Sequence, residues 1–178
     1  MTLEIPWIDL SDEKVKRLFE LVAAAHYGSA MKNRNASSAA AVNSYFASGS
    51  VAQAISSSIL TIGTRHAPVR ESREVLKSFS EEVAKLFLAN GSKVPGFGNS
   101  FFKEGIDPEW VPVFEYMTEN FPEKVARIEQ IKGWIGKPIY PNPAMLTAVA
   151  CDLAKVPHGC EVAVFALMRI PAWVSLLL

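Results

Sequence analysis

The chain has 178 residues, of which 49% are hydrophobic and 20% are charged, as is typical of a folded globular protein. This length supports a single domain with its own hydrophobic core. Eighteen basic residues balance eighteen acidic ones, so no net charge attracts nucleic acid or an anionic membrane surface. We therefore expect no nucleic-acid partner and no membrane partner.

The N-terminus and the cysteines favour a reducing compartment, the cytoplasm. The first residues include several acidic side chains and lack the basic and apolar blocks of a signal peptide. The longest apolar stretches, 162–168 and 170–178, are interrupted or too short to span a bilayer. Cys151 and Cys160 lie among apolar residues without the spacing of metal ligands. This pattern predicts buried, reduced thiols and no metal site.

Apolar residues recur at intervals of three and four over most of the chain, which predicts an all-α fold. The first helix begins after Ser11, a good N-cap, and ends at Gly28. A second helix, rich in small residues, covers 35–46, and a third runs from its cap, Ser50, to Ile62. Because small side chains let helices approach closely, we expect this pair to be buried.

Helix-breaking glycine and proline residues divide the next part of the chain. Residues 69–89 predict one helix or a bent pair, and a Gly/Pro loop follows over 92–105. Pro108 and Pro122 each stand at a first-turn position and open a helix.

The last third of the chain predicts two helices. Asn142 is placed to cap a helix that runs from 143 to about 155. The final helix runs from 161 to about 168, and Pro171 then turns or kinks the chain before residues 173–178.

Three segments with polar, glycine and proline residues interrupt this helical pattern. They are Arg65-His66-Ala67-Pro68, Val94-Pro95-Gly96-Phe97-Gly98-Asn99 and Asn142-Pro143-Ala144. Their order and spacing resemble the three active-site segments of the citrate synthase family. The likeness is to the C-terminal half of citrate synthase, to citryl-CoA lyase and to the lyase module of ATP-citrate lyase. It covers about residues 35–169 and extends to an ending, Arg169-Ile170-Pro171-Ala172-Trp173, that is similar to the family's.

The resemblance implies a citrate-synthase-like helical fold, truncated to the C-terminal half, in a single domain over 1–178. Residues 35–66 and 142–178 would form large-domain-like helices, and residues 67–141 small-domain-like helices. The family packs helices across a two-fold axis, so the resemblance also implies a homodimer or higher homo-oligomer.

The resemblance assigns three catalytic roles, and two of the positions lack the side chain that the role needs. The positions of the family's base, enolate donor and acid hold Ala144, His66 and Asn99 here. Alanine takes no proton, and an asparagine amide donates a hydrogen bond but gives up no proton at neutral pH. Each loss lowers the rate by roughly 10² to 10⁴, so we expect no citrate synthesis. Asp152, about 12 Å further along a helix than Ala144, cannot replace the base.

The histidines have ordinary interpretations as well. His66 is either a donor to a carbonyl or enolate oxygen, or a partly buried, hydrogen-bonded structural residue. His26 and His158 are expected at helix ends, as caps or solvated groups.

The glycine loop keeps more of the family's pattern. Residues that match the loop whose backbone holds CoA are Pro95, Gly96, Phe97 and Gly98. Glycine lets backbone groups approach a nucleotide closely, and Lys93 and Lys103 could meet its phosphates. The alternative is a tight connector that needs glycine for turn geometry alone.

Charged positions around the expected site partly depart from the family. Arg169 matches an arginine that holds a substrate carboxylate. Lys32 stands where the family has a substrate-binding histidine, and with Arg34 it could neutralise a carboxylate. Glu109, after Asp107-Pro108, replaces an arginine and so reverses the charge.

Two functions of different classes follow. The lost base, the lost acid and the reversed charge favour a non-catalytic homo-oligomer for binding or assembly. Its apolar surface would be buried against a second copy or another protein. The kept loop, His66 and Arg169 favour a CoA-ester enzyme, an acyl-CoA C–C bond synthase or lyase with an altered substrate and CoA or an acyl-CoA as cofactor. Fold likeness alone does not decide between them.

Overall fold

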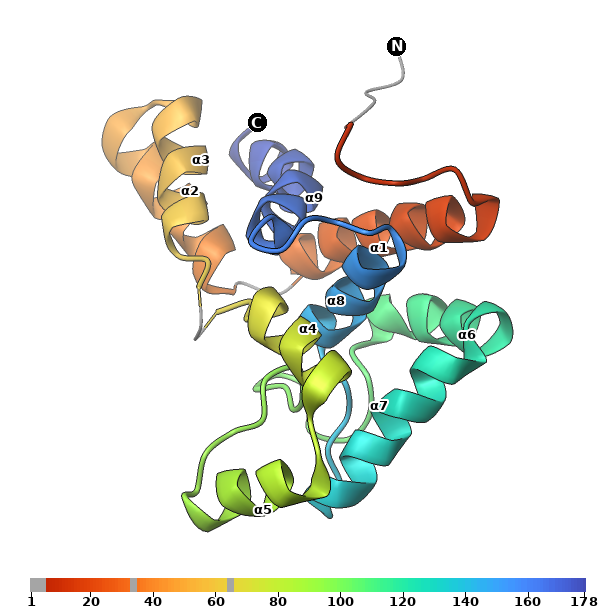
Figure 1. The fold of residues 1–178 in the computed structure, drawn as a ribbon. Helices are drawn as coiled ribbons and strands as arrows, with labels where there is room; N and C mark the ends of the chain where they lie inside the picture. The colour runs from red at the N-terminus through yellow and green to blue at the C-terminus, as the bar shows by residue number, and fades with distance from the viewer. Residues whose placement is uncertain (1–5, 33–34, 64–65) are drawn as a thin grey trace.

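Helices make up the regular structure of the computed structural model, which describes residues 6–32, 35–63 and 66–178 (Figure 1). Within these ranges the chain forms nine α-helices, a single 3₁₀ helix and no β-strand, so the predicted all-α fold is confirmed. The α-helices are α1 (Glu13–Lys32), α2 (Ala36–Ser48), α3 (Val51–Leu60), α4 (Val69–Ser78), α5 (Glu81–Ala89), α6 (Val111–Asn120), α7 (Pro122–Ile135), α8 (Pro143–Leu153) and α9 (Glu161–Leu177). The 3₁₀ helix η1 covers Pro108–Trp110.

Polar caps begin several helices, and those at Ser50 and Asn142 are the ones that the sequence predicts. The side chains of Asn35, Ser50 and Asn142 accept hydrogen bonds from backbone N–H groups in the first turns of α2, α3 and α8. Residues 69–89 form the bent pair rather than one helix, because Ser80 caps a new helix, α5, directly after α4 ends.

The predicted start and end of the first helix are both wrong. Asp12, not Ser11, caps α1, since its Oδ1 accepts a hydrogen bond of 2.7 Å from the backbone N–H two residues on. Gly28 lies inside the helix instead of ending it. A glycine there costs about 1 kcal/mol relative to alanine, but it leaves the space that the Glu109 side chain occupies.

Helix α9 also runs further than predicted, through Pro171. A proline in a helix removes the hydrogen bond to the carbonyl four residues earlier, here that of Leu167. Both residues are exposed, so the proline lies on the solvent side of the helix. As a result, one continuous helix carries the buried residues Arg169 and Trp173.

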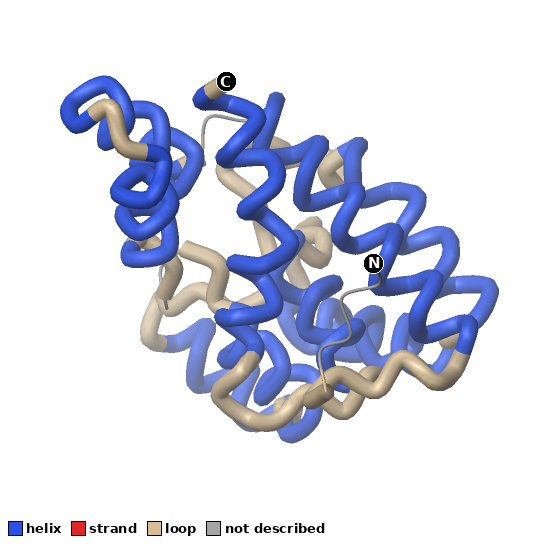
Figure 2. The backbone as a smooth tube through the Cα atoms, turned by 90° about the horizontal axis from the view of Figure 1, so that it is seen from above, coloured by secondary structure: helices blue, strands red, loops and turns tan. Residues whose placement is uncertain are grey.

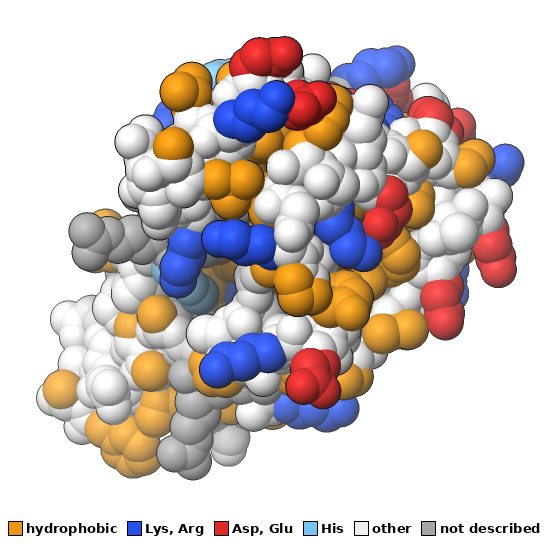
Figure 3. Space-filling model, turned by 90° about the horizontal axis from the view of Figure 1, so that it is seen from below, with side chains coloured by type: hydrophobic (Ala, Val, Ile, Leu, Met, Phe, Trp, Pro, Cys, Tyr) orange, Lys and Arg blue, Asp and Glu red, His pale blue; other side chains and the backbone are white. Residues whose placement is uncertain are grey.

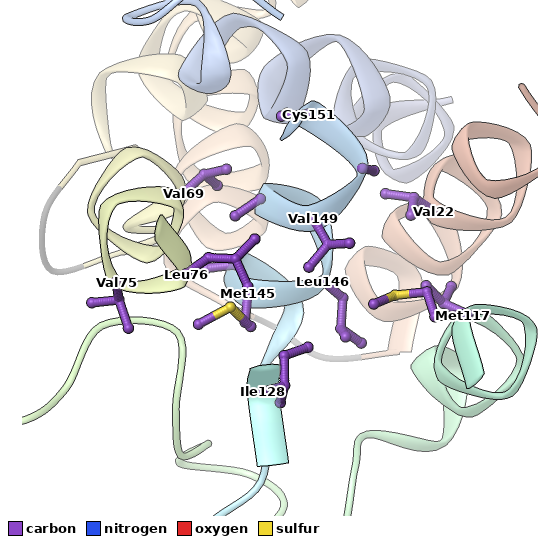
Figure 4. Close-up of a cluster of buried hydrophobic side chains, with 14 of the residues drawn as sticks. Val22, Val69, Val75, Leu76, Met117, Ile128, Met145, Leu146, Val149 and Cys151 are labelled. Atoms are coloured by element: carbon purple, nitrogen blue, oxygen red, sulfur yellow. The ribbon is translucent and has the colours of Figure 1, made fainter. Parts of the chain in front are cut away.

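The core forms around α8, whose residues 144–151 are all buried. Figure 4 shows Val69 and Leu76 of α4 on one side of this helix, and Val22 of α1 and Met117 of α6 on the other. Each such side chain contributes about 1.5–3 kcal/mol when fully buried. This packing holds the N-terminus of α8, and therefore Ala144, in a fixed position.

The α2–α3 hairpin lies at one edge of the molecule, beside α9 (Figures 1 and 2). Its buried residues are small: Ser37, Ser38, Ala41, Ala54 and Ser58. Phe46 and Leu60 are 83% and 85% exposed. The expectation that this pair is buried is therefore wrong for the single chain, because α2 and α3 shield mainly each other.

The two cysteines are free, with Cys151 buried and Cys160 half-buried. Burial raises the pKa of Cys151 to about 12, so this residue stays a thiol at neutral pH. In the part of the chain that the structure describes, no three His, Cys, Asp or Glu side chains are grouped to hold a metal ion. No helix of the same part has both the length and the apolar character that crossing a membrane requires.

Candidate functional site

A cavity of about 190 Å³ lies where the connection before α4, the glycine loop, the start of α8 and helix α9 meet. The residues singled out in the sequence that line it are His66, Gly98, Asn99, Ala144 and Arg169. The three expected catalytic positions thus share one cavity, although they lie on three separate segments.

Asn142 ties the glycine loop to the start of α8. Its backbone N–H donates to the carbonyl of Gly96 and its side-chain amide to that of Gly98, each at 2.9 Å. Gly96 and Gly98 have φ values of 85° and 77°, a region that favours glycine. A Cβ on Gly96 would also meet the Met145 side chain at 2.6 Å. The loop therefore needs glycine for both its backbone and its packing, and it brings Asn99 to the cavity.

Arg169 is the buried cation of the cavity, with 4% of its surface exposed. Its Nε donates to His26 Nδ1 at 3.1 Å, and the guanidinium lies over the Phe165 ring at 4.9 Å. Its Nη1 is buried and has no hydrogen-bond partner among the described residues. Burial lowers the pKa of Arg169 to about 10, which still leaves the side chain charged at pH 7.

His26 holds Arg169 in place, a role that the sequence did not suggest. Its Nε2 lies 2.9 Å from Thr147 Oγ1, and the Thr147 hydroxyl donates to the Pro143 carbonyl at 2.7 Å. Nε2 must therefore carry the proton, while Nδ1 accepts from Arg169. Burial, and then the charge of Arg169, hold the pKa of His26 well below its usual value. The predicted solvated or capping role is wrong for His26; its position on the apolar face of α1 was the available signal.

His66 is half-buried at the cavity wall, with its Nε2 3.2 Å from Ser37 Oγ. The Ser37 hydroxyl donates to Asn35 Oδ1 at 2.8 Å, so it can only accept from His66. The proton of His66 is thus on Nε2 and directed at Ser37 rather than at a ligand. Burial, and then Arg169, lower the pKa of His66 and favour its neutral form.

At the two positions that the resemblance assigns to the acid and the base, the described neighbours provide no carboxylate or histidine in their place. Asn99 Oδ1 accepts from the Phe101 N–H at 2.9 Å, and Ala144 is buried in the first turn of α8. Asp152 lies near Arg73, Lys77 and Lys124 instead of at the cavity. His158 is exposed, and its Nε2 lies 3.0 Å from Glu74 Oε1.

Asp107 is a carboxylate that does line the cavity, and the sequence assigned it no role. It is buried, its Oδ2 accepts from the Ser29 hydroxyl at 2.9 Å, and its Oδ1 accepts from the Glu109 N–H at 3.0 Å. Trp110 Nε1 donates to Ser29 Oγ at 2.9 Å, which directs the serine proton towards Asp107. Both oxygens of Asp107 are therefore engaged by the protein.

A larger groove of about 1000 Å³ adjoins the cavity and shares Gly98 and Asn99 with it. All the residues expected to bind CoA line this groove, namely Pro95, Gly96, Phe97, Gly98 and Lys103. Lys93 and Lys137 line it as well, the latter unpredicted. Figure 3 shows one face of the molecule that is hollowed, with a histidine visible inside the hollow and basic side chains beside it. This arrangement gives a basic groove that opens towards the smaller cavity.

Two solved structures have the same arrangement of helices. The citryl-CoA lyase of Hydrogenobacter thermophilus matches 98% of this chain and 70% of its own, with 17% identity and a TM-score of 0.76. The citrate synthase of Thermotoga maritima MSB8 matches 92% of this chain and 48% of its own, with 25% identity and a TM-score of 0.69. The chain has the fold of the citrate synthase family. No protein-family model and no curated protein matches the sequence.

In this citrate-synthase-like fold, Lys32 and Glu109, the two charged residues that differ from the pattern of the resemblance, lie together. Lys32 does not line the cavity; its Nζ forms an ion pair with Glu109 Oε1. The charges of Lys32 and Glu109, the two residues that the resemblance matched to a histidine and an arginine, thus neutralise each other. Arg34, the other expected carboxylate partner, lies outside the described residues.

Proposed function

We propose that this chain is a non-catalytic binding protein that holds a small carboxylate in the cavity and acts as a homo-oligomer. The observation that supports binding is the buried Nη1 of Arg169, which has no partner among the described residues of a cavity wall. A buried donor without a partner costs about 1–3 kcal/mol, and more when it is charged. A ligand carboxylate would remove this cost through a charge-assisted hydrogen bond.

The chemistry of the other cavity residues supports binding without catalysis. Condensation at a carbon next to a thioester needs a base, and position 144 supplies only a methyl group. The proton of His66 is directed at Ser37, and both oxygens of Asp107 accept hydrogen bonds from the protein. We therefore expect acetyl-CoA and oxaloacetate to release free CoA thiol no faster than without the protein.

Calorimetric titration with acetate, butanoate, succinate and citrate tests the binding proposal. At least one of these acids should bind with saturation, and Arg169→Gln should weaken it at least 30-fold. Arg17→Gln is the matched control, since Arg17 is exposed and paired with Glu20 on α1. Arg169→Lys, which keeps the charge, guards against loss of folding. No binding by folded wild-type protein, or equal binding by Arg169→Gln, would contradict the proposal.

The basic groove supports a second candidate, a CoA ester whose acyl end enters the cavity. Lys93, Lys103 and Lys137 line the groove beside the glycine loop and could meet phosphates. Titration with CoA and acetyl-CoA should then show binding that Lys103→Glu weakens about tenfold. Lys85→Glu is the control, because Lys85 is an exposed residue of α5 paired with Glu81. The same weakening in both variants would indicate general charge attraction and contradict a specific groove.

The α2–α3 hairpin supports the homo-oligomer. Its Phe46 and Leu60 are exposed apolar side chains that a second copy could cover. Light scattering after size exclusion should give a mass of two or more chains, and a Phe46→Ser/Leu60→Ser variant should shift it to 19.5 kDa. A monomeric wild-type chain would contradict this part of the proposal.

A further inference from the structure

The Lys32–Glu109 ion pair lies beside the cavity. Ser29 and Asp107 both line the cavity wall. Lys32 follows Ser29 by one helical turn on α1, and Glu109 follows Asp107 by two residues in η1. The pair therefore bridges the two elements that supply one side of the wall.

The position of Glu109 is built into the fold. A Cβ on residue 28 would overlap the Glu109 carboxylate, so the glycine of α1 provides the space for it. Glu109 is 25% exposed in its side chain, and its backbone N–H is held by Asp107 Oδ1. This packing keeps the Glu109 carboxylate next to Lys32 and prevents the lysine from binding a ligand carboxylate.

The described wall of the cavity thus offers positive charge to one carboxylate. Arg169 has a buried Nη1 that can donate a hydrogen bond to a ligand oxygen. Lys32 is neutralised by Glu109, while Asp107 adds a negative side chain to the wall. Among the described residues of this wall, a second carboxylate on the ligand would lose hydration without gaining a free cation, which is unfavourable away from water.

The other residues of the cavity wall suit a ligand that is uncharged apart from its one carboxylate. Its apolar members include Ala67, Pro68, Pro143, Ala144 and Phe165. Asn99 adds a neutral amide, which could hydrogen-bond a carbonyl or hydroxyl group. The cavity volume of about 190 Å³ matches a short acid rather than a large one.

We propose that the cavity selects short monocarboxylic acids, and that the Lys32–Glu109 ion pair, seated on Gly28, is the element that rejects di- and tricarboxylic acids. This inference rests on the proposed function, since it specifies the ligand class of the same cavity.

Butanoate and succinate provide the test, because they have the same chain length and differ by one carboxylate. In calorimetric titration, wild-type protein should bind butanoate at least tenfold more tightly than succinate. Glu109→Gln frees Lys32 and should raise succinate affinity about tenfold while changing butanoate affinity less than twofold. Lys32→Gln should have the opposite effect and weaken succinate further. Glu104→Gln is the control, because it removes one exposed negative charge from the same loop.

The outcomes separate the two proposals. If butanoate and succinate both bind through Arg169 with equal affinity, the selectivity inference is overturned and the binding function stands. Equal effects of Glu109→Gln and Glu104→Gln also overturn it, because the ion pair would then have no special role. If neither acid nor citrate binds to the folded protein, the proposed function fails and the inference fails with it.

Discussion

Two buried arginines, at opposite ends of the packing around α8, differ in how completely the protein satisfies them. Arg73 of α4 donates to Glu161 Oε1 at 2.8 Å and to the Val156 carbonyl at 2.7 Å, and it lies 3.4 Å from Asp152. Arg169 of α9 is as deeply buried, but it has one hydrogen bond, to a neutral histidine, and a free Nη1 among the described residues. Burial is thus the same, and only the partners differ.

This difference separates a structural charge from a candidate binding charge. A buried charge is tolerated when partners and hydrogen bonds compensate for its lost hydration. Arg73 meets this condition within the chain and joins α4 to α8 and α9. Arg169 meets it only in part, which is why we assign it to a ligand rather than to stability.

The largest effect should come from removing each arginine in turn. Arg73→Met leaves the Glu161 carboxylate buried without its cation and should lower the free energy of unfolding by about 3–5 kcal/mol. Arg169→Met removes a charge that is only partly compensated and should change the free energy by about 1 kcal/mol. Urea denaturation measures both. An Arg73→Met/Glu161→Gln variant should recover part of the first loss, and equal losses for Arg73→Met and Arg169→Met would abolish the distinction.

The groups around Arg169 and those around Arg73 should also change the stability of the protein over different pH ranges. Burial lowers the pKa of His26 and of His66, so below their ordinary value of about 6.5 the unfolded chain binds protons that the folded chain does not. Stability should therefore fall as pH drops from 6.5 towards 5, by up to about 1.4 kcal/mol per pH unit for each group. Urea denaturation across this range should show a smaller slope for His26→Gln than for wild type.

The carboxylates around Arg73 should act only at lower pH. Burial opposes the ionisation of Glu161 and Asp152, but hydrogen bonds and nearby cations outweigh it and lower the pKa of both. Their contribution is present above the ordinary carboxyl values near 4 and is lost as pH falls through the folded pKa values. A slope between pH 6.5 and 5 that persists in a His26→Gln/His66→Gln variant would show that other groups titrate there.

The smallest effect should come from the hydroxyl that supports His26. Thr147→Val removes the acceptor for the Nε2 proton of a buried histidine and should cost about 1 kcal/mol of stability. Because His26 positions Arg169, acid binding should weaken several-fold as well, and thermal denaturation with and without butanoate measures both effects. Thr118→Val is the control, since Thr118 is exposed on α6. A loss of stability without any change in binding would make His26 a purely structural residue.

Much of the helical fold could be predicted from the sequence, because caps and helical periods depend on residues within about four positions of each other. Ser50 and Asn142 cap the helices that they were expected to cap, and Asn35 caps α2 without having been predicted to. The errors at Gly28 and Pro171 have a different origin. The first depends on the distant Glu109, and the second on the exposed position of Pro171 in the folded chain.

The order of three short motifs, together with the ending at Arg169, was enough to predict which fold this chain adopts and which residues lie around its cavity: His66, Asn99, Ala144 and Arg169. Tertiary structure alone decided how their charges are used. The contact between His26 and Arg169 joins residues 143 positions apart, and the ion pair of Lys32 and Glu109 joins residues 77 positions apart. No local pattern encodes such contacts, because they arise only when packed helices bring distant side chains together. The same packing leaves one guanidinium nitrogen of the cavity without a partner in the described chain.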